Sequence, residues 1–210
     1  MKLLPPLTFP FAFLLLVSFI QGKVKYPGIT PSPLDMFSPA WSDPKYLKCN
    51  TASDVKYMTT TEKEVIYILN LARTNPALFA NTVVTKYPAS HTGYYKSLLN
   101  EMLTLKPQNL LYPDSLCYAG AFCHAVNSGL QGYVGHDRSN EECRKKWYYN
   151  GECCDYGNNK PLDIIMSLLI DEGISSLGHR KICLSSYKKI GVSIQPHKVY
   201  RVTTVLDFHY

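Results

Sequence analysis

KKIGVSIQPHKVYRVTTVLDF, residues 188–208, is the stretch that decides the fold class. Residues 190–194 and 199–208 are rich in β-branched and aromatic side chains, and a polar turn at 195–198 separates them. This pattern predicts a β-hairpin whose second strand is central in its sheet. The segments upstream of the hairpin have helical spacing instead. Helices first and strands last predict an α+β fold with a central antiparallel sheet.

The first upstream helix is expected to begin near Thr61. Thr61 and Glu64 have capping-box spacing directly before an apolar series at helical intervals. Asn75-Pro76 should break or restart this helix, because proline disfavours the helical conformation of the residue before it. Residues 86–112 then form a connection that contains a short helix at 95–105.

A second long helix is expected after Asp114, which is a good N-cap residue, and Gly129 should end it. Its predicted buried stripe consists of apolar residues at helical spacing: Leu116, Ala119, Phe122, Cys123 and Val126. His124 lies in the middle of this helix and is interpreted as partly buried structure.

Two shorter helices follow. Ser139 and Glu142 form another capping-box pattern, and residues 148–160 are expected to be a loop that contains Gly151-Glu152. Pro161 suits the first turn of an apolar helix that Gly173 ends.

The N-terminal residues 1–22 have the pattern of a secretory signal peptide. Lys2 supplies a positive charge, an apolar run follows, and Gly22 precedes the expected cut. The alternative is an uncleaved membrane anchor, which the prolines within the run disfavour. No later segment is long and apolar enough to span a membrane, so we expect a soluble protein outside the cytoplasm.

Residues 23–58 are rich in proline and are expected to form an extended N-terminal leader, which Trp41 and Tyr46 attach to the domain. Residues 59–210 then form a single domain. The formal net charge of +6 is spread over short clusters. No polybasic run with interleaved aromatic residues argues for nucleic acid as a partner.

All seven cysteines follow the expected cleavage site, and in an oxidising compartment most of them should form disulfides. Cys117 and Cys123 share a predicted helix about 9 Å apart, which is too far for a disulfide between them. The remaining pairings stay open. A zinc cluster is disfavoured because no pair of Cys-x-x-Cys units occurs.

Imidazoles and carboxylates beside glycines gather between Gly135 and Arg180. These side chains bind metals or transfer protons near neutral pH. His136, Glu152 and His179 are the main candidates. Asp171-Glu172 follows a predicted helix, where acids oppose the helix dipole, and such placement favours another role. For each residue alone, an ordinary loop or surface role is the alternative.

The order of several short motifs resembles the CAP superfamily, which comprises the cysteine-rich secretory, antigen 5 and pathogenesis-related 1 proteins and is also called the SCP domain family. The resemblance covers about residues 60–208, and residues 176–180 are most similar to microbial members. The motifs are Leu69-Asn70-Leu71-Ala72-Arg73, Leu116 with Ala119 and His124-Ala125, Gly135-His136, Gly151-Glu152, Gly178-His179-Arg180 and Ile190-Gly191-Val192.

This resemblance implies a three-layer α-β-α sandwich with a central cleft that holds two histidines and two acids, and that binds Zn²⁺ or another divalent cation in some members. By position, His136 and His179 correspond to the metal-binding histidines and Glu152 to the first acid. Glu172 is the candidate for the second acid, with Asp171 or Ser176 as alternatives. Cys153 stands where the family motif has asparagine, and we expect this departure to draw the loop into a disulfide.

The leading hypothesis is therefore a secreted module that binds an extracellular ligand or a divalent cation in this cleft. A hydrolase is the first alternative, either metal-dependent or using Ser175 or Ser176 with His179 and Glu152. A lipid- or sterol-binding protein, with residues 86–112 along a groove, is the second. No Gly-x-Ser-x-Gly or His-Glu-x-x-His motif supports hydrolysis.

Overall fold

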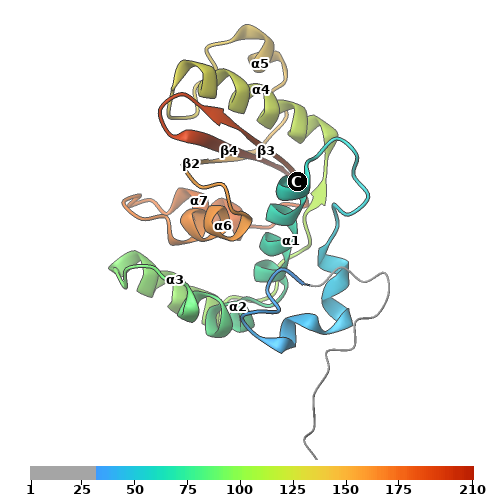
Figure 1. The fold of residues 1–210 in the computed structure, drawn as a ribbon, viewed down its shortest axis with the longest axis vertical. Coiled ribbons are helices and arrows are strands. Elements are labelled where there is room, and N and C mark those ends of the chain that lie inside the picture. The colour runs from blue at the N-terminus through green and yellow to red at the C-terminus, as the bar shows by residue number, and fades with distance from the viewer. Residues whose placement is uncertain (1–31) are drawn as a thin grey trace, which may run out of the picture. The chain divides into compact units, whose positions relative to one another are not determined.

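The hairpin of β3 (Lys189–His197) and β4 (Arg201–His209) forms the middle of the sheet (Figure 1). β4 pairs antiparallel with β2 (Gly151–Tyr156), and β3 pairs parallel with the short β1 (Tyr112–Pro113). Across residues 32–210, which the computed structural model describes, the sheet order is β1-β3-β4-β2. The hairpin and its central second strand are confirmed. The sheet is mixed rather than purely antiparallel.

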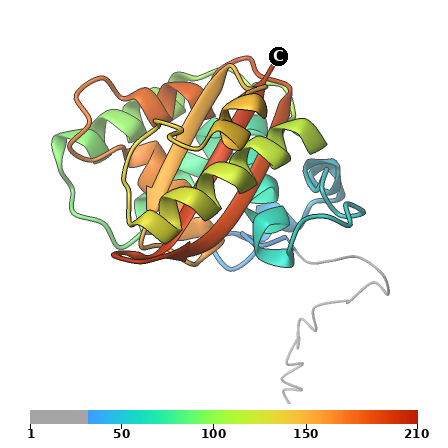
Figure 2. The same ribbon diagram turned by 90° about the horizontal axis from the view of Figure 1, so that it is seen from above.

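Helices cover both faces of this sheet (Figures 1 and 2). The long helix α4 packs across β3 and β4 on one face, while α1, α6 and α7 lie on the other. The molecule is thus a mixed α/β protein, consistent with the predicted α+β class. Its α-helices are α1 (Thr60–Thr74), α2 (Pro76–Thr82), α3 (Gly93–Thr104), α4 (Ser115–Gln131), α5 (Glu141–Lys145), α6 (Pro161–Ile170) and α7 (Gly178–Cys183).

The predicted loop over 148–160 is wrong, because Gly151–Tyr156 form β2. Every residue of this strand except Tyr156 is buried. A strand covered on both faces lacks the alternation of apolar and polar residues that reveals a half-exposed strand. Here the buried positions are occupied by Glu152, Asp155 and two cysteines, whose polarity made the segment resemble a loop.

The predicted buried stripe of α4 is wrong at Leu116 and Phe122, although Cys123 is buried as predicted. Leu116 and Phe122 are 54 % and 42 % exposed, whereas the face toward the sheet carries small or polar residues: Cys117, Gly120, Ala121, His124, Ala125 and Ser128. Small side chains let the helix approach β3 and β4 closely. The buried face of α4 is therefore the one with the smallest side chains and not the most hydrophobic one. Asp114 is confirmed as the N-cap, and buried His124 as structure.

Several helix ends differ from the prediction by one to three residues. The capping box of α1 pairs Thr59 with Glu62, not Thr61 with Glu64. The Glu62 side chain is buried. Its second oxygen accepts a hydrogen bond from the Ile194 N–H. The break at Asn75-Pro76 is confirmed.

At the other ends, the N-cap of α5 is Asn140 and not Ser139, since the Asn140 side chain accepts from two backbone N–H groups. Helix α4 continues past Gly129 to a left-handed Gly132, at φ 70°. Helix α6 begins at Pro161 as predicted but ends before Asp171 rather than at Gly173. The short helix expected at 95–105 is α3.

Residues 32–58 belong to the same compact unit as the rest of the described chain, while the expected signal peptide at 1–22 lies outside the described residues. Trp41 and Tyr46 are buried with ring centroids 4.9 Å apart, which confirms them as anchors. The segment is not extended: Pro39–Ser42 and Pro44–Cys49 are 3₁₀ helices, each begun by the fixed φ of a proline. A third 3₁₀ helix covers Val84–Lys86.

A disulfide joins Cys123 of α4 to Cys143 of α5, in agreement with the prediction that Cys117 and Cys123 do not pair. The expectation that most cysteines pair, and that Cys153 enters a disulfide, is wrong for the described chain, where the cysteines outside this disulfide are buried free thiols: Cys49, Cys117, Cys153, Cys154 and Cys183. The sulfur atoms of Cys153 and Cys183 are 3.9 Å apart. Within residues 32–210, no helix is both long and apolar enough to cross a membrane.

Candidate functional site

His136 and Glu152 are in direct contact. His136 lies in the loop after α4, and its Nδ1 is 2.8 Å from Oε1 of Glu152 on β2. The His136 side chain is 54 % exposed, whereas that of Glu152 is almost completely buried. The hydrogen bond to Glu152 raises the pKa of His136, although partial burial opposes the shift. The carboxylate therefore fixes the orientation of an otherwise exposed imidazole.

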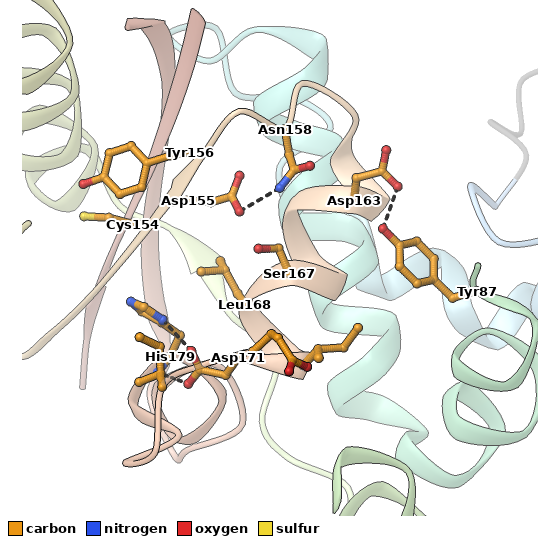
Figure 3. A pocket seen from close by; sticks show the side chains of 13 residues that line it. Tyr87, Cys154, Asp155, Tyr156, Asn158, Asp163, Ser167, Leu168, Asp171 and His179 are labelled. Atoms are coloured by element: carbon orange, nitrogen blue, oxygen red, sulfur yellow. Dashed lines mark hydrogen bonds and ion pairs between the residues drawn. The ribbon is translucent and has the colours of Figure 1, made fainter. Parts of the chain in front are cut away.

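His179 has the same arrangement with a different acid. It lies at the start of α7, and its Nδ1 is 2.8 Å from Oδ1 of Asp171 (Figure 3). The second oxygen of Asp171 accepts a hydrogen bond from the His179 backbone N–H at 3.0 Å. Asp171 adopts a left-handed conformation, φ 57°, at the end of α6, and this turns its buried side chain back toward α7.

The two imidazoles lie close to each other. Their ring centroids are 6.1 Å apart, with planes inclined by 42°. Neither Nε2 atom has a hydrogen-bond partner among the described residues. The structure thus brings together His136, Glu152 and His179, and of the alternatives for the second acid it places Asp171 beside His179.

Glu172, the first choice for the second acid, points elsewhere. Its Oε2 accepts a hydrogen bond from the Thr92 hydroxyl at 2.6 Å on the surface. Ser176, the other alternative, makes no hydrogen bond to either imidazole within residues 32–210. Asp171 therefore occupies the place beside His179, because the chain turns between α6 and α7 in a way that sequence spacing does not reveal.

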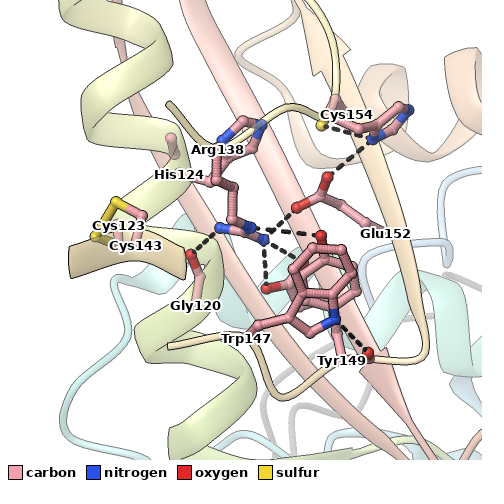
Figure 4. A network of polar contacts seen from close by, with 12 residues as sticks. Gly120, Cys123, His124, Arg138, Cys143, Trp147, Tyr149, Glu152 and Cys154 are labelled. Carbon is pink, nitrogen blue, oxygen red and sulfur yellow. Dashed lines mark hydrogen bonds and ion pairs between the residues drawn. A yellow bond between two sulfur atoms is a disulfide. The ribbon is translucent and has the colours of Figure 1, made fainter. Parts of the chain in front are cut away.

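Glu152 also belongs to a buried ionic cluster centred on Arg138 (Figure 4). The Arg138 guanidinium donates to Glu152, to Asp207 of β4 at 3.1 Å, and to the carbonyl of Gly120 at 2.8 Å. All three charged side chains are at most 3 % exposed. One guanidinium thus serves two buried carboxylates, and Glu152 links this cluster to the imidazole of His136.

The pKa values of the two acids in this cluster shift in opposite directions. Burial raises the pKa of Asp207 well above its usual value, and the neighbouring charge of Glu152 adds to this. Burial acts the same way on Glu152, but the hydrogen bond from His136 and the charge of Arg138 outweigh it and lower the pKa. Glu152 is thereby kept ionised as the acceptor for His136.

A second set of three side chains has its donor atoms close enough together to hold a metal ion. Donor atoms of His124, Glu152 and Cys154, all buried, lie within 4.8 Å of one another. His124 Nε2, however, is 2.9 Å from the Gly135 carbonyl oxygen, and Glu152 is engaged by His136 and Arg138. Burial raises the pKa of the Cys154 thiol well above its usual value, which disfavours the thiolate that metals bind.

Sequence reasoning missed Arg138, Asp207 and Asp155. Of these three residues, Asp207 could most readily have been predicted from the sequence. It is a single acid within the apolar run Val205-Leu206-Asp207-Phe208, and a buried acid requires a buried partner. Arg138 follows His136 by two residues, but nothing in its spacing indicates that its side chain turns inward. Asp155 belongs to β2, which resembled a loop.

A pocket of about 350 Å³ lies beside His179, between β2 and α6 (Figure 3). Asp155 projects into it from β2 and is 4 % exposed. Its Oδ1 accepts from the Asn158 amide at 2.9 Å, whereas its Oδ2 has no hydrogen-bond partner among the described residues. Burial raises the pKa of Asp155 to about 6.

Replacing Asp155 by asparagine is expected to stabilise the protein near neutral pH by on the order of 2–3 kcal/mol. Because the pKa is higher in the folded state, ionisation of Asp155 favours unfolding, fully so above about pH 6. The gain should shrink as pH falls through 6 and vanish below about pH 4. Urea unfolding of both proteins at several pH values measures this, and a gain independent of pH would contradict the assignment.

Comparison of this chain with protein-family models, with curated proteins and with solved structures finds no match.

Proposed function

We propose that this chain is a secreted binding protein of the CAP type, whose cleft holds a divalent cation between His136 and His179. Zn²⁺ is the first candidate for that cation. One observation carries the proposal: each imidazole has its Nδ1 held by a buried carboxylate and its Nε2 free.

This arrangement is the one that metal-binding histidines use in proteins. A carboxylate that accepts a hydrogen bond from the Nδ1–H group fixes the neutral tautomer, orients the ring and makes Nε2 a stronger ligand. Two imidazoles that share one tetrahedral zinc ion have ring centroids about 5–5.5 Å apart, given Zn–N bonds of about 2.0–2.1 Å. The observed separation of 6.1 Å is slightly longer, so the half-exposed His136 ring would move toward His179 by less than about 1 Å to share the ion.

The CAP assignment is supported by the order of motifs in the sequence and by helices on both faces of the sheet. The candidate cleft residues also lie together, with Asp171 as the second acid. Cys153 departs from the family pattern, but its side chain is buried toward Cys183 and does not face the imidazoles. Secretion is proposed from the pattern of residues 1–22 and the cysteine content.

Binding is favoured over hydrolysis because the site has no oriented nucleophile. Neither Ser175 nor Ser176 hydrogen-bonds to His179 within the described chain, and Glu152 is engaged by an ion pair with Arg138 and a hydrogen bond with His136. Binding of lipid or sterol along α3 is disfavoured too, since three of its apolar residues, Tyr95, Leu98 and Met102, are buried in the core and only Leu103 is largely exposed.

Zinc titration by calorimetry tests the proposal. The double substitution His136→Ala with His179→Ala should weaken Zn²⁺ binding by more than about 100-fold, because both ligands are lost. Asp171→Asn should weaken it by about 10–100-fold, since only the orientation of His179 is affected.

The matched control is His91→Ala with His209→Ala, which removes two histidines outside the cleft and should leave the affinity unchanged. Equal zinc affinity in wild type and in the His136/His179 double variant would refute the metal site.

A further inference from the structure

The pocket between β2 and α6 has a strongly acidic wall. Of its thirteen lining residues, four are acids and none is a lysine or arginine. Those acids are Asp155, Asp163, Asp171 and Glu172. Nearby like charges with no lining cation create a negative potential that concentrates positively charged ligands.

Three of these acids are already engaged by neighbouring groups. Asp163 accepts from the Tyr87 hydroxyl at 2.9 Å, Asp171 holds His179, and Glu172 accepts from Thr92. Asp155 alone presents a buried oxygen without a hydrogen-bond partner among the described residues. A buried acceptor without a donor is costly unless a ligand or water satisfies it.

A second unsatisfied atom lies next to Asp155. Thr204 of β4 pairs with Asp155 in register, so the two side chains are on the same face of the sheet. The buried hydroxyl of Thr204 also lacks a partner within the described chain. The Ser167 hydroxyl of α6 faces this region from the opposite wall (Figure 3). In the pocket lining itself, the acceptor oxygens at this end are those of Asp155 and Ser167, while Thr204 is buried beside Asp155 and does not line the pocket.

The rest of the pocket is apolar enough for an alkyl chain. Leu168, Ile170 and Ile174 line it together with the rings of Tyr87 and Tyr156. Its volume of about 350 Å³ suits a small organic molecule. A bare Ca²⁺ ion fits less well, because it requires six to eight oxygen ligands and most carboxylate oxygens here are already engaged.

We propose that this pocket binds a primary ammonium group carried on a short alkyl chain, with Asp155 Oδ2 as its main acceptor. An ammonium group has three N–H donors and no acceptor, which matches a site rich in oxygen acceptors. The alkyl chain lies along Leu168 and Ile170. This recognition element goes beyond metal binding at the cleft, although His179 and Asp171 border both.

The test uses n-pentylammonium as the probe and n-pentanol as its neutral counterpart, at about pH 8, where the carboxylates are ionised. Metal-free protein in the presence of EDTA is titrated, and amide chemical shifts are followed by NMR. Saturable binding of n-pentylammonium, but not of n-pentanol, is expected. Asp155→Asn should weaken it tenfold or more, because a charge-assisted hydrogen bond is lost.

Two controls make the result decisive. Asp54→Asn removes an exposed acid from a turn outside the pocket and should bind the probe like wild type. His136→Ala removes a proposed metal ligand that does not line the pocket, so it should lose zinc affinity and keep ammonium binding. Failure of the metal proposal is thereby distinguishable from failure of this one.

A parallel titration with Nα-acetyl-lysine methylamide separates two sources of the ammonium group. Binding of both probes includes lysine side chains of peptides, whereas binding of n-pentylammonium alone limits the ligands to free amines; either result supports the subsite. Equal affinity of wild type and Asp155→Asn, equal binding of n-pentanol, or no saturable binding would overturn it, leaving water as the occupant.

Discussion

Substituting Arg138 by methionine is expected to lower the free energy of unfolding by about 3–5 kcal/mol. Arg138 is the cation that serves both Glu152 and Asp207, and all three side chains are buried. Methionine keeps much of the volume of the side chain but removes the guanidinium shared by Glu152 and Asp207, so that Asp207 loses its cation and Glu152 keeps only the contact with His136. Removing one partner of a buried ion pair is costly for this reason.

Urea denaturation of Arg138→Met measures the loss, with Arg144→Met as the matched control on an exposed surface. The control should change stability by no more than about 0.5 kcal/mol. Adding Asp207→Asn to Arg138→Met should recover part of the loss, because one unpaired carboxylate is removed. An Arg138→Met protein as stable as the Arg144→Met control would show that the cluster contributes nothing to folding.

Substituting Gly191 by alanine is expected to cost about 3 kcal/mol or more. Gly191 lies on β3 where α4 crosses the sheet, and a Cβ atom there would overlap the backbone of Cys117 and Tyr118. Backbone atoms cannot rotate away as a side chain can, so β3 and α4 would have to separate. That separation would expose core residues along the interface that the small residues of α4 create.

The comparison protein is Gly93→Ala, at the first residue of α3, where nothing lies within 4 Å of the added Cβ. This change should be neutral or stabilising by up to about 1 kcal/mol, because alanine favours a helix more than glycine does. Thermal unfolding of both variants gives the difference. A Gly191→Ala protein that melts with wild type would contradict the close approach of β3 and α4.

The hairpin and the existence of most helices could be predicted because their signals are local. Each signal depends on only a few neighbouring residues. They are the β-branched run of β4, the N-cap Asp114 of α4, and the prolines that begin α2 and α6. The strand β2 could not be predicted, because it is covered on both faces and carries buried acids and cysteines.

The residues of the candidate site that lie in local motifs could be predicted, and those that meet only through the fold could not. His136, Glu152 and His179 stand out through their motifs, and the structure places them together. The choice of Asp171 over Glu172 depends on a single left-handed residue after α6. Arg138 and Asp207 are 69 residues apart and meet only in the folded protein. Such contacts follow from topology rather than from spacing.

Anomalous diffraction at the zinc absorption edge, from crystals grown with one equivalent of Zn²⁺, tests the central claim most directly. The account predicts one strong peak between His136 and His179, bonded to both Nε2 atoms at about 2.0–2.1 Å. A peak at His124, Glu152 and Cys154 instead, or no ordered zinc at the two imidazoles, would contradict it.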